Sequence, residues 1–497
     1  MLIRSNSLAQ QLRLMMLRCL SSAAFALMLA GALSPVHAQT PTPTPFSSGS
    51  TGADGAFSDT VFPQNFCARS GSRITCTPPD TGVFNFTTVN ISANVDVVFR
   101  PNSSNTPVTI LAQGDVRIAQ TFYLNGEGGD DANSLGGRGG PGGFRGGVGG
   151  VWSSGASGKS GDGPGGGGGA VATPDGSDAS GGGGGSYFTS GSMGTGGGPN
   201  PALAGRTYGS KILLPLIGGS GGGGSSAYLN GLGGAGGGGG GAILIASSTQ
   251  IIFEGGFAGI QAIGGEPGCS NRICGGAGSG GAIRLVANTI TGNPRLLAYG
   301  GTARGTRGNS GGAGYVRYEA FNLENFRPTF GGASNFSFGR PNPVRLPNDP
   351  QLRIVSVGGV NAPPQPAGSF YTAQPDLVVP ESVSNPVNVV VQAINLPLTP
   401  APIVQVTRIM DTGERATDTC TLTGSAASST CTARVTLQLT KTSLIIATTT
   451  VDGLLAFGRP VFIDGERVNK VEIAAAFGGQ SEVTYITESG RRLKWPQ

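Results

Sequence analysis

Short hydrophobic runs separated by turn residues open the ordered part of this sequence. Between residues 50 and 125, β-branched and aromatic residues gather in runs that recur about every ten positions, with glycine, asparagine or proline between them. None of the runs has the 3.6-residue period of an amphipathic helix. The pattern predicts β-strands at residues 83–86, 95–99, 108–112 and 116–119.

A related unit recurs three times after residue 240. Each copy has a glycine run, a short apolar strand, a turn, a second strand and further glycines, and the copies start at Gly241, Gly281 and Gly312. Constant strands with variable spacing indicate a repeating coil from which insertions loop out. We expect an all-β, right-handed parallel β-helix-like solenoid over residues 50–340, with the earlier strands stacked beneath the repeats. An irregular β-sandwich with chance similarity is the alternative.

The amino-acid composition changes again near residue 350, where glycine becomes rarer and valine, threonine and proline become more frequent. About six apolar runs alternate with polar residues from there on, which is typical of an immunoglobulin-like β-sandwich. We therefore assign residues 350–497 to a C-terminal domain of this kind with a β extension. Lys470 to Phe477 is the one helix candidate outside the N-terminal segment.

Residues 126–241 hold 50 of the 90 glycines in the chain. Glycine adds no side chain to a core and loses the most backbone entropy on folding, so this block cannot fold as an ordinary domain. Three states remain open: disorder, loops held on a scaffold, or packed extended polyglycine helices with threefold symmetry. We treat the block as a glycine-rich insertion in the solenoid.

The N-terminus reads as an export signal. Three arginines precede a short apolar run, and Val36-His37-Ala38 fits the small-x-small rule for cleavage, so residues 1–38 are expected to be removed. The alternative is an uncleaved membrane anchor. The apolar run is shorter than the roughly 20 residues of a membrane span, which favours cleavage. Residues 39–49 contain alternating Thr and Pro and are expected to form an extended linker.

Removal of the signal changes the available chemistry. The formal charge falls from +5 to +2 because three arginines and no acids leave, so the chain lacks the charge of a polyanion binder, and we expect no nucleic-acid partner. The only histidine, His37, leaves as well. A mature chain without histidine cannot form a Ser-His-Asp triad or a His-ligated zinc site.

Six cysteines remain after cleavage, in three pairs that are close in sequence. An even count in an exported chain favours disulfides, and local pairing is the simplest of the 15 possible connectivities. The last pair encloses a short serine-rich turn and is expected to close a hairpin at its base. A structural metal site is the alternative, although no C-x₂-C spacing occurs. The pairs are Cys67/Cys76, Cys269/Cys274 and Cys420/Cys431.

Several phrases of the N-terminal half resemble a known group of proteins. They are Thr51-Gly52-Ala53-Asp54-Gly55-Ala56-Phe57, residues 82–91, residues 106–119 and the GGAI repeats. Together they are similar to uncharacterised glycine-rich secreted or surface proteins of Gram-negative bacteria. The resemblance covers roughly residues 50–320 and implies extracellular placement and a parallel β-helix-like body. It implies no catalytic residue.

Two glycine-rich stretches contain charged residues that are candidates for binding calcium or nucleic acid. Glu127, Asp130 and Asp131 could hold calcium through oxygen ligands, although their spacing does not match a calcium-binding glycine repeat, and a solvated turn is the simpler interpretation. Residues 137–147 resemble an RGG segment, but the charge and the export signal favour a structural glycine loop. We expect no cofactor, with calcium as the open possibility.

The remaining candidate residues are ones that could bind carbohydrate. Arg284 and Arg317 occupy similar repeat positions and are expected to stack as a solvent-facing row that either grips acidic glycans or has no ligand. Trp152, Tyr187 and Tyr208 are candidates to stack on sugars. No pair of carboxylates recurs at matched repeat positions, so a polysaccharide lyase or hydrolase is the least favoured class. The sequence favours a non-enzymatic, secreted structural or adhesive protein that associates with itself or with surface glycans.

Overall fold

The computed structural model of the chain describes residues 46–495, apart from short internal segments. Those segments are residues 132–134, 152–156, 173–178, 197–201, 228–230, 271–272, 306–308, 332–334, 347, 364–374, 439–440 and 476–480. Nearly all regular structure in the described part is β-strand, and its one α-helix is the short α2 (Gly453–Phe457). No helix of the described residues has the length and apolar character needed to cross a membrane.

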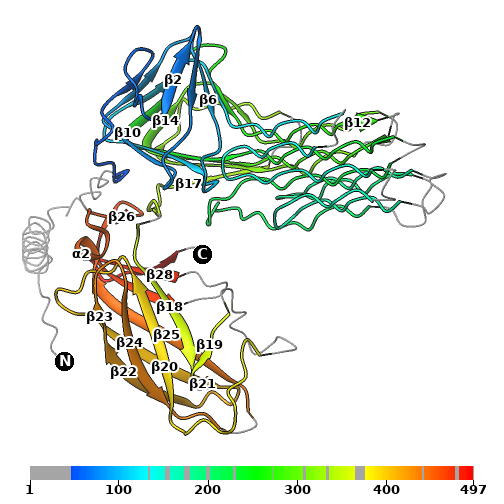
Figure 1. The fold of residues 1–497 in the computed structure, drawn as a ribbon. Helices are drawn as coiled ribbons and strands as arrows, with labels where there is room; N and C mark the ends of the chain where they lie inside the picture. The colour runs from blue at the N-terminus through cyan, green and yellow to red at the C-terminus, as the bar shows by residue number, and fades with distance from the viewer. Residues whose placement is uncertain are drawn as a thin grey trace, which may run out of the picture. The chain divides into compact units, whose positions relative to one another are not determined.

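A long sheet of nine strands forms the centre of the N-terminal part, and its strands are parallel (Figure 1). Seven strands follow the order β1-β5-β8-β10-β14-β16-β17, while β7 pairs with the long strand β10 and carries β4. The strands are β1 (Phe57–Ser58), β4 (Val83–Phe86), β5 (Val89–Ile91), β7 (Val108–Ala112), β8 (Val116–Ile118), β10 (Ala242–Phe253), β14 (Ala282–Thr291), β16 (Tyr315–Asn322) and β17 (Asn335–Gly339).

A second sheet of six strands lies against the first and shares its core. Its order is β15-β11-β9-β6-β3-β2, and only β2 and β3 are antiparallel. From β3 onward the chain passes back and forth between the two sheets. The described residues show this stacking but no closed solenoid. The strands are β2 (Cys67–Ser70), β3 (Arg73–Cys76), β6 (Asp96–Phe99), β9 (Thr121–Tyr123), β11 (Gly259–Gln261) and β15 (Arg295–Leu297).

The three predicted repeats stack in register. Ile243 of β10 lies beside Ile283 of β14, which lies beside Val316 of β16, and all three are fully buried in the core. The earlier strand β7 pairs with β10, which confirms that the strands before residue 125 stack against the repeats. One detail differs, because Ala282 pairs with Tyr315 and the third copy therefore aligns two residues later than the sequence motif suggested.

The C-terminal part consists of two antiparallel sheets around a separate core. The five-stranded sheet has the order β19-β18-β20-β24-β23, and the seven-stranded sheet has the order β22-β21-β25-β27-β28-β29 with β26 paired to β27. The five strands are β18 (Gln351–Val357), β19 (Val360–Asn361), β20 (Val387–Ile394), β23 (Thr423–Gly424) and β24 (Ser429–Val435). The other seven are β21 (Ile403–Met410), β22 (Arg415–Thr421), β25 (Ser443–Asp452), β26 (Phe462–Ile463), β27 (Glu466–Ala475), β28 (Ser481–Thr487) and β29 (Arg492–Trp495).

Alternating burial explains these C-terminal strands. In β20 the valines at 387, 389 and 391 are buried while Asn388 between the first two is exposed, as expected when one sheet face meets the core. The predicted helix at residues 470–477 is wrong for its described part, because β27 continues to Ala475. Val471 and Ile473 point into the core between β25 and β28, so packing with period two outweighs the local helix preference.

Three disulfides join the cysteines that are close in sequence. Cys67 pairs with Cys76 across β2 and β3, and Cys269 pairs with Cys274 across β12 (Cys269–Ser270) and β13 (Ile273–Cys274). Cys420 lies on β22 in one C-terminal sheet, whereas Cys431 lies on β24 in the other. The last bridge therefore connects the two sheets. The expectation of a bridge closing a simple hairpin is wrong, because the chain changes sheets between β22 and β23.

Candidate functional surface

The glycine-rich runs leave the two sheets and pack together as one bundle of extended segments (Figure 1). Three excursions contribute: each leaves the six-stranded sheet after β9, β11 or β15 and returns to the nine-stranded sheet at β10, β14 or β16. The sequence indicated one insertion at residues 126–241, but the shorter glycine runs between the repeats belong to the same bundle. Backbone bonds such as Gly241 N to Leu124 O (2.7 Å) join the bundle to the strand ends.

Hydrogen bonds in the bundle follow a threefold pattern. In the central segment 219–226, the N–H groups of residues 219, 222 and 225 donate to carbonyls of residues 234–240. Those of residues 221 and 224 donate to residues 159–162, and those of residues 223 and 226 donate to residues 180–183. Successive residues thus face three different neighbours, as in a left-handed helix with three residues per turn and no internal hydrogen bonds.

Only glycine fits at most of these positions because the backbones touch. A Cβ atom added to Gly222 would lie closer than 3.0 Å to the carbonyl oxygen of Gly276, and one added to Gly236 would meet the carbonyl of Gly222 in the same way. The side-chain hydrogen of glycine is therefore what permits each segment to bond to its neighbours. Of the three states open from the sequence, packed threefold helices describe these residues.

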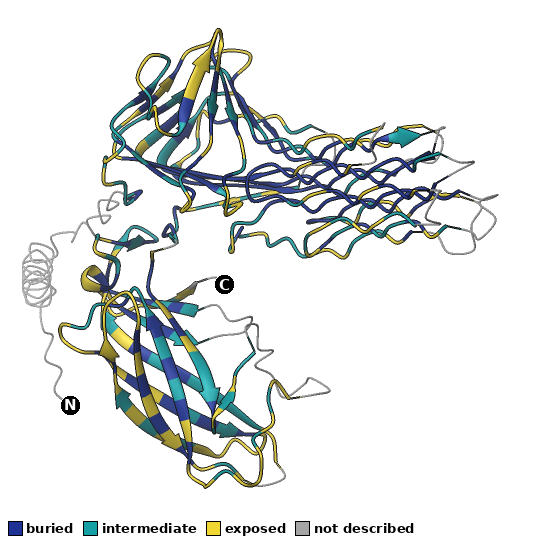
Figure 2. Cartoon of the chain, in the orientation of Figure 1, coloured by how far each residue is buried: buried dark blue, intermediate teal, exposed yellow. Residues whose placement is uncertain are grey.

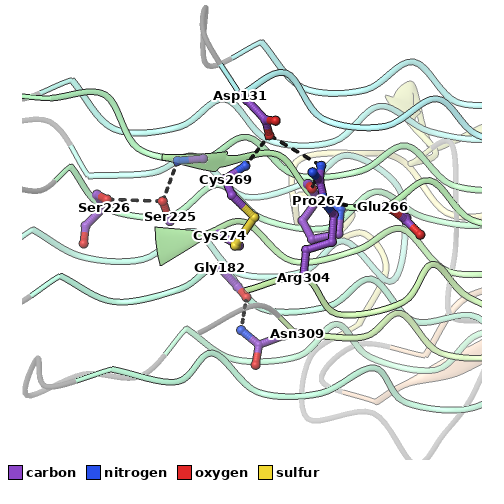
Figure 3. Close-up of a disulfide and its surroundings, with 11 residues drawn as sticks. Asp131, Gly182, Ser225, Ser226, Glu266, Pro267, Cys269, Cys274, Arg304 and Asn309 are labelled. Atoms are coloured by element: carbon purple, nitrogen blue, oxygen red, sulfur yellow. Dashed lines mark hydrogen bonds and ion pairs between the residues drawn. A yellow bond between two sulfur atoms is a disulfide. The ribbon is translucent and has the colours of Figure 1, made fainter. Parts of the chain in front are cut away.

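A disulfide clips the bundle at a distance from the sheets, where β12 and β13 form a small hairpin (Figures 1 and 3). The backbone N–H of Cys269 donates to a carboxylate oxygen of Asp131 at 2.5 Å. Arg304 pairs with the same oxygen at 3.5 Å and donates to the carbonyl of Pro267 at 3.2 Å. The contacts of Asp131 and Arg304 hold three glycine-rich excursions side by side, because the residues come from all three, whereas the bridge closes a hairpin within one of them.

The calcium candidates do not converge on one point. Glu127 forms an ion pair with Arg100 at 2.8 Å, whereas Asp131 faces Arg304 and Cys269. The backbone N–H of Asp130 donates to Leu135. Among the described residues there is no group of three or more histidine, cysteine or acidic side chains placed to hold a metal ion. The carboxylates of Glu127 and Asp131 are thus paired with arginines, and that of Asp131 also accepts a backbone N–H bond.

Exposed residues are scattered along the segments of the bundle, among buried ones (Figure 2), and several of the exposed residues are large and apolar. Charged groups such as Lys159 are also exposed. The exposed fractions of the apolar side chains range from 37% to 64%. This surface therefore combines a stiff, fully bonded backbone with scattered hydrophobic contacts. The large apolar residues concerned are Leu135, Val148, Val151, Val171, Met193 and Leu203.

Of the two described tyrosines proposed for sugar binding, Tyr187 lies inside the protein and Tyr208 is half-buried. Tyr187 is fully buried and packs edge-to-face with Tyr208 at 4.9 Å between ring centroids. The Tyr208 hydroxyl donates to the Gly218 carbonyl at 2.5 Å and accepts a bond from Ser220. Burial raises the pKa of both phenols well above the ordinary value. Burial excludes Tyr187 as an exposed sugar contact, whereas the expectation for Tyr208 stays a prediction, and Trp152 lies outside the described residues.

Arg284 and Arg317 stand side by side, as expected from the repeat, but they do not face solvent. Their residues are 1% and 9% exposed, and both guanidinium groups donate to Glu319, which is fully buried. The Nε–Oε1 distances are 3.1 Å for Arg284 and 2.6 Å for Arg317. The solvent-facing row is therefore a buried cluster. Glu319 lies two residues after Arg317 on the same face of β16, a spacing that could have identified it as the partner.

Electrostatics keep Glu319 ionised. Burial by itself raises the pKa of this carboxyl, but the charges of Arg284 and Arg317 and their hydrogen bonds outweigh burial, so its pKa lies below the ordinary value of 4.5. The backbone N–H of Asn342 donates to the second oxygen at 2.9 Å. A carboxylate held in this way is neutralised and fully bonded, which makes the cluster a structural element of the sheet.

No protein-family model, curated protein or solved structure matches this chain. Its function must therefore be inferred from the chain itself.

Proposed function

We propose that this chain is a secreted or cell-surface protein with a structural or adhesive role and without catalytic activity. The three disulfides indicate an oxidising environment outside the cytoplasm. That environment agrees with the export signal expected at residues 1–38. Relationship to the glycine-rich secreted or surface proteins of Gram-negative bacteria is part of the same proposal.

The polyglycine bundle is the observation that carries the proposal. Its segments are stiff because each bonds to several neighbours, and at most of its glycines the backbones are in direct contact. A large part of the chain therefore forms a rigid, weakly charged surface rather than a pocket. The exposed apolar side chains of the bundle suit contact with broad surfaces, where many weak interactions act together.

The finer architecture fits this role. We propose that the alternating parallel strands form a right-handed β-helix-like platform from which the bundle projects. The C-terminal pair of sheets is proposed to be an immunoglobulin-like domain. Binding of glycans is the weaker proposal, since Tyr187 and both arginines are buried, Tyr208 is half-buried, and no observation favours a sugar at those positions.

An attachment assay on native cells tests this proposal. Intact cells carrying the full-length gene are treated with an added protease, and their attachment to solid surfaces is compared with that of cells lacking the protein. We expect the protein to be accessible to the protease and attachment to depend on it. Protein that is protected inside the cell, or attachment that does not change, would contradict the proposal.

Variants locate the effect on the bundle. Changing the exposed Leu135 and Leu203 to serine removes apolar contacts without touching a buried position, so attachment should fall while secretion is unchanged. Leu454→Ser with Leu455→Ser is the matched control, because these leucines are similarly exposed on α2 in the C-terminal part. Equal loss in both variants would indicate a general effect of hydrophobicity rather than a role of the bundle.

A further inference from the structure

The last strand of the long parallel sheet, β17, has an open edge. It pairs with β16 on one side, and no other strand in the described part of the chain pairs with its outer side. It carries no charged residue and no proline between Asn335 and Gly339. Proteins usually block such an edge with lysine, proline or a covering segment, because its free backbone groups bind further strands.

Aromatic side chains extend to this edge. Phe338 stacks on Tyr318 of β16 with 5.6 Å between ring centroids, and Phe336 stacks on Phe330 at 4.5 Å. Nevertheless, Phe336 and Phe338 are 45% and 64% exposed. The aromatic row of the core thus continues to the last strand and stops there without cover.

The opposite end of the same sheet is closed. Residues 54 and 55 bond to β4, where Asp54 N donates to Asn85 O at 2.9 Å and Thr87 N donates to Gly55 O at 2.7 Å. The phenylalanines of that end, Phe57 and Phe84, are each only 1% exposed. The aromatic side chains are therefore covered at the β1 end of the sheet and exposed at the β17 end, which favours β17 over a head-to-tail contact as the site for an additional strand.

We propose that β17 binds β17 of a second copy of this chain in an antiparallel, tail-to-tail pair. The sequence Phe336-Ser337-Phe338 reads the same in both directions, so pairing centred on Ser337 places each Phe336 opposite Phe338 of the second copy. Such cross-strand aromatic pairs stabilise a sheet. The strand has no charge that would repel its copy, and the contact is self-complementary, as a two-fold interface requires. The proposal does not depend on the proposed surface role.

A cysteine placed at the centre of the pair tests the geometry. Directly opposed residues of antiparallel strands have Cα atoms about 4.5–5.5 Å apart, which is within the range of a disulfide. We therefore expect Ser337→Cys in the purified mature chain to form an intermolecular disulfide dimer under mild oxidation. Ser190→Cys, an exposed serine in the bundle, is the control and should remain largely monomeric.

Sedimentation of the purified chain tests the contact without cross-linking. The unaltered chain should sediment as a monomer–dimer mixture, and Phe338→Lys should weaken the dimer about tenfold or more by placing a charge in the aromatic row. Phe257→Lys changes an equally exposed phenylalanine that lies outside any strand and should leave the dimer intact. A monomer at all concentrations, open-ended oligomers, or equal cross-linking of Ser337→Cys and Ser190→Cys would overturn the proposal.

Discussion

Arg284 and Glu319 form an ion pair in which both side chains are almost completely withdrawn from solvent. The two residues lie on adjacent parallel strands, β14 and β16, with Arg284 Nε 3.1 Å from Glu319 Oε1 and Nη2 3.2 Å from Oε2. Buried pairs of this kind add little to stability compared with apolar residues, but removing one partner leaves an uncompensated charge. The pair therefore makes the sheet sensitive to substitution at either residue.

Glu319→Gln should lower the free energy of unfolding of the parallel sheet by about 3–5 kcal/mol, because Arg284 and Arg317 would both keep a buried charge. Hydrogen exchange of β14 and β16 measures this locally. The control is Glu254→Gln, which removes a half-exposed partner of Arg117 and should cost less than about 1 kcal/mol. Equal effects of the two substitutions would contradict the importance of burial.

The same cluster predicts a dependence on pH. The pKa of Glu319 is lower in the folded chain than its ordinary value of 4.5, so the folded state holds fewer protons. Its contribution to stability is therefore complete above pH 4.5 and is lost as the pH falls through the lower, folded pKa. Exchange protection of β16 should fall in acid more steeply in the unaltered chain than in Glu319→Gln. Parallel acid profiles would disprove this.

Gly222→Ala should destabilise the bundle by at least about 3 kcal/mol, because the added Cβ meets the backbone at Gly276, which cannot move without breaking its own hydrogen bonds. Gly256→Ala is the matched control. A Cβ at that position meets nothing within 4 Å, and Gly256 does not have a positive φ. Thermal unfolding followed by circular dichroism distinguishes the two, and unchanged stability of Gly222→Ala would refute the packing described for the bundle.

Two buried tyrosines should respond oppositely to loss of their hydroxyl groups. The Tyr187 hydroxyl has no hydrogen-bond partner among the described residues, so Tyr187→Phe should stabilise the bundle by about 1 kcal/mol. Tyr208→Phe should destabilise it by a similar amount, since the bond to the Gly218 carbonyl is lost. Denaturant unfolding compares the variants, and a loss of stability in Tyr187→Phe would contradict the assignment of an unpaired hydroxyl.

The inter-sheet disulfide should stabilise the C-terminal part alone. Replacing Cys420 and Cys431 with serine opens a loop with a sequence separation of 11 and should cost about 3 kcal/mol in the chain-entropy model. Exchange protection should fall in β20–β25 and stay unchanged in the bundle. Replacing Cys269 and Cys274 should do the reverse. Loss of protection throughout the chain in either variant would show that the two parts unfold together.

Much of the fold follows from local patterns. The valines of β20 predicted a strand because they alternate with polar residues, as one face of a sheet does. The repeat strands were predictable as short apolar runs between glycines, and both of their faces are buried. The stacking of β10, β14 and β16 followed from the repeat itself. The strand at Lys470 could not be predicted from its local pattern, because its apolar residues suit a helix or a strand. Pairing with the neighbouring strands β25 and β28 decided between the two.

The candidate functional residues were harder to place from sequence. Arg284 and Arg317 occupy matched repeat positions, which predicted that they are neighbours, but burial depends on what covers the sheet. Leu216 and Val344 pack on that same face and are distant from both arginines in sequence. Tyr187 and Tyr208 also looked like surface aromatics within a glycine run, whereas the surrounding loops enclose Tyr187 and leave Tyr208 half-buried.

The sequence by itself determined that this is a β-rich chain with repeating strands, three local cysteine pairs and a glycine block too poor in side chains to form an ordinary core. Periodicity, cysteine spacing and glycine content are local properties, and their effects on the structure do not depend on which distant segments come into contact. Only the tertiary structure decided that three separate glycine runs form one bundle and that one disulfide joins two sheets. It also decided that the arginine row is buried, because these outcomes depend on which distant segments of the chain come into contact.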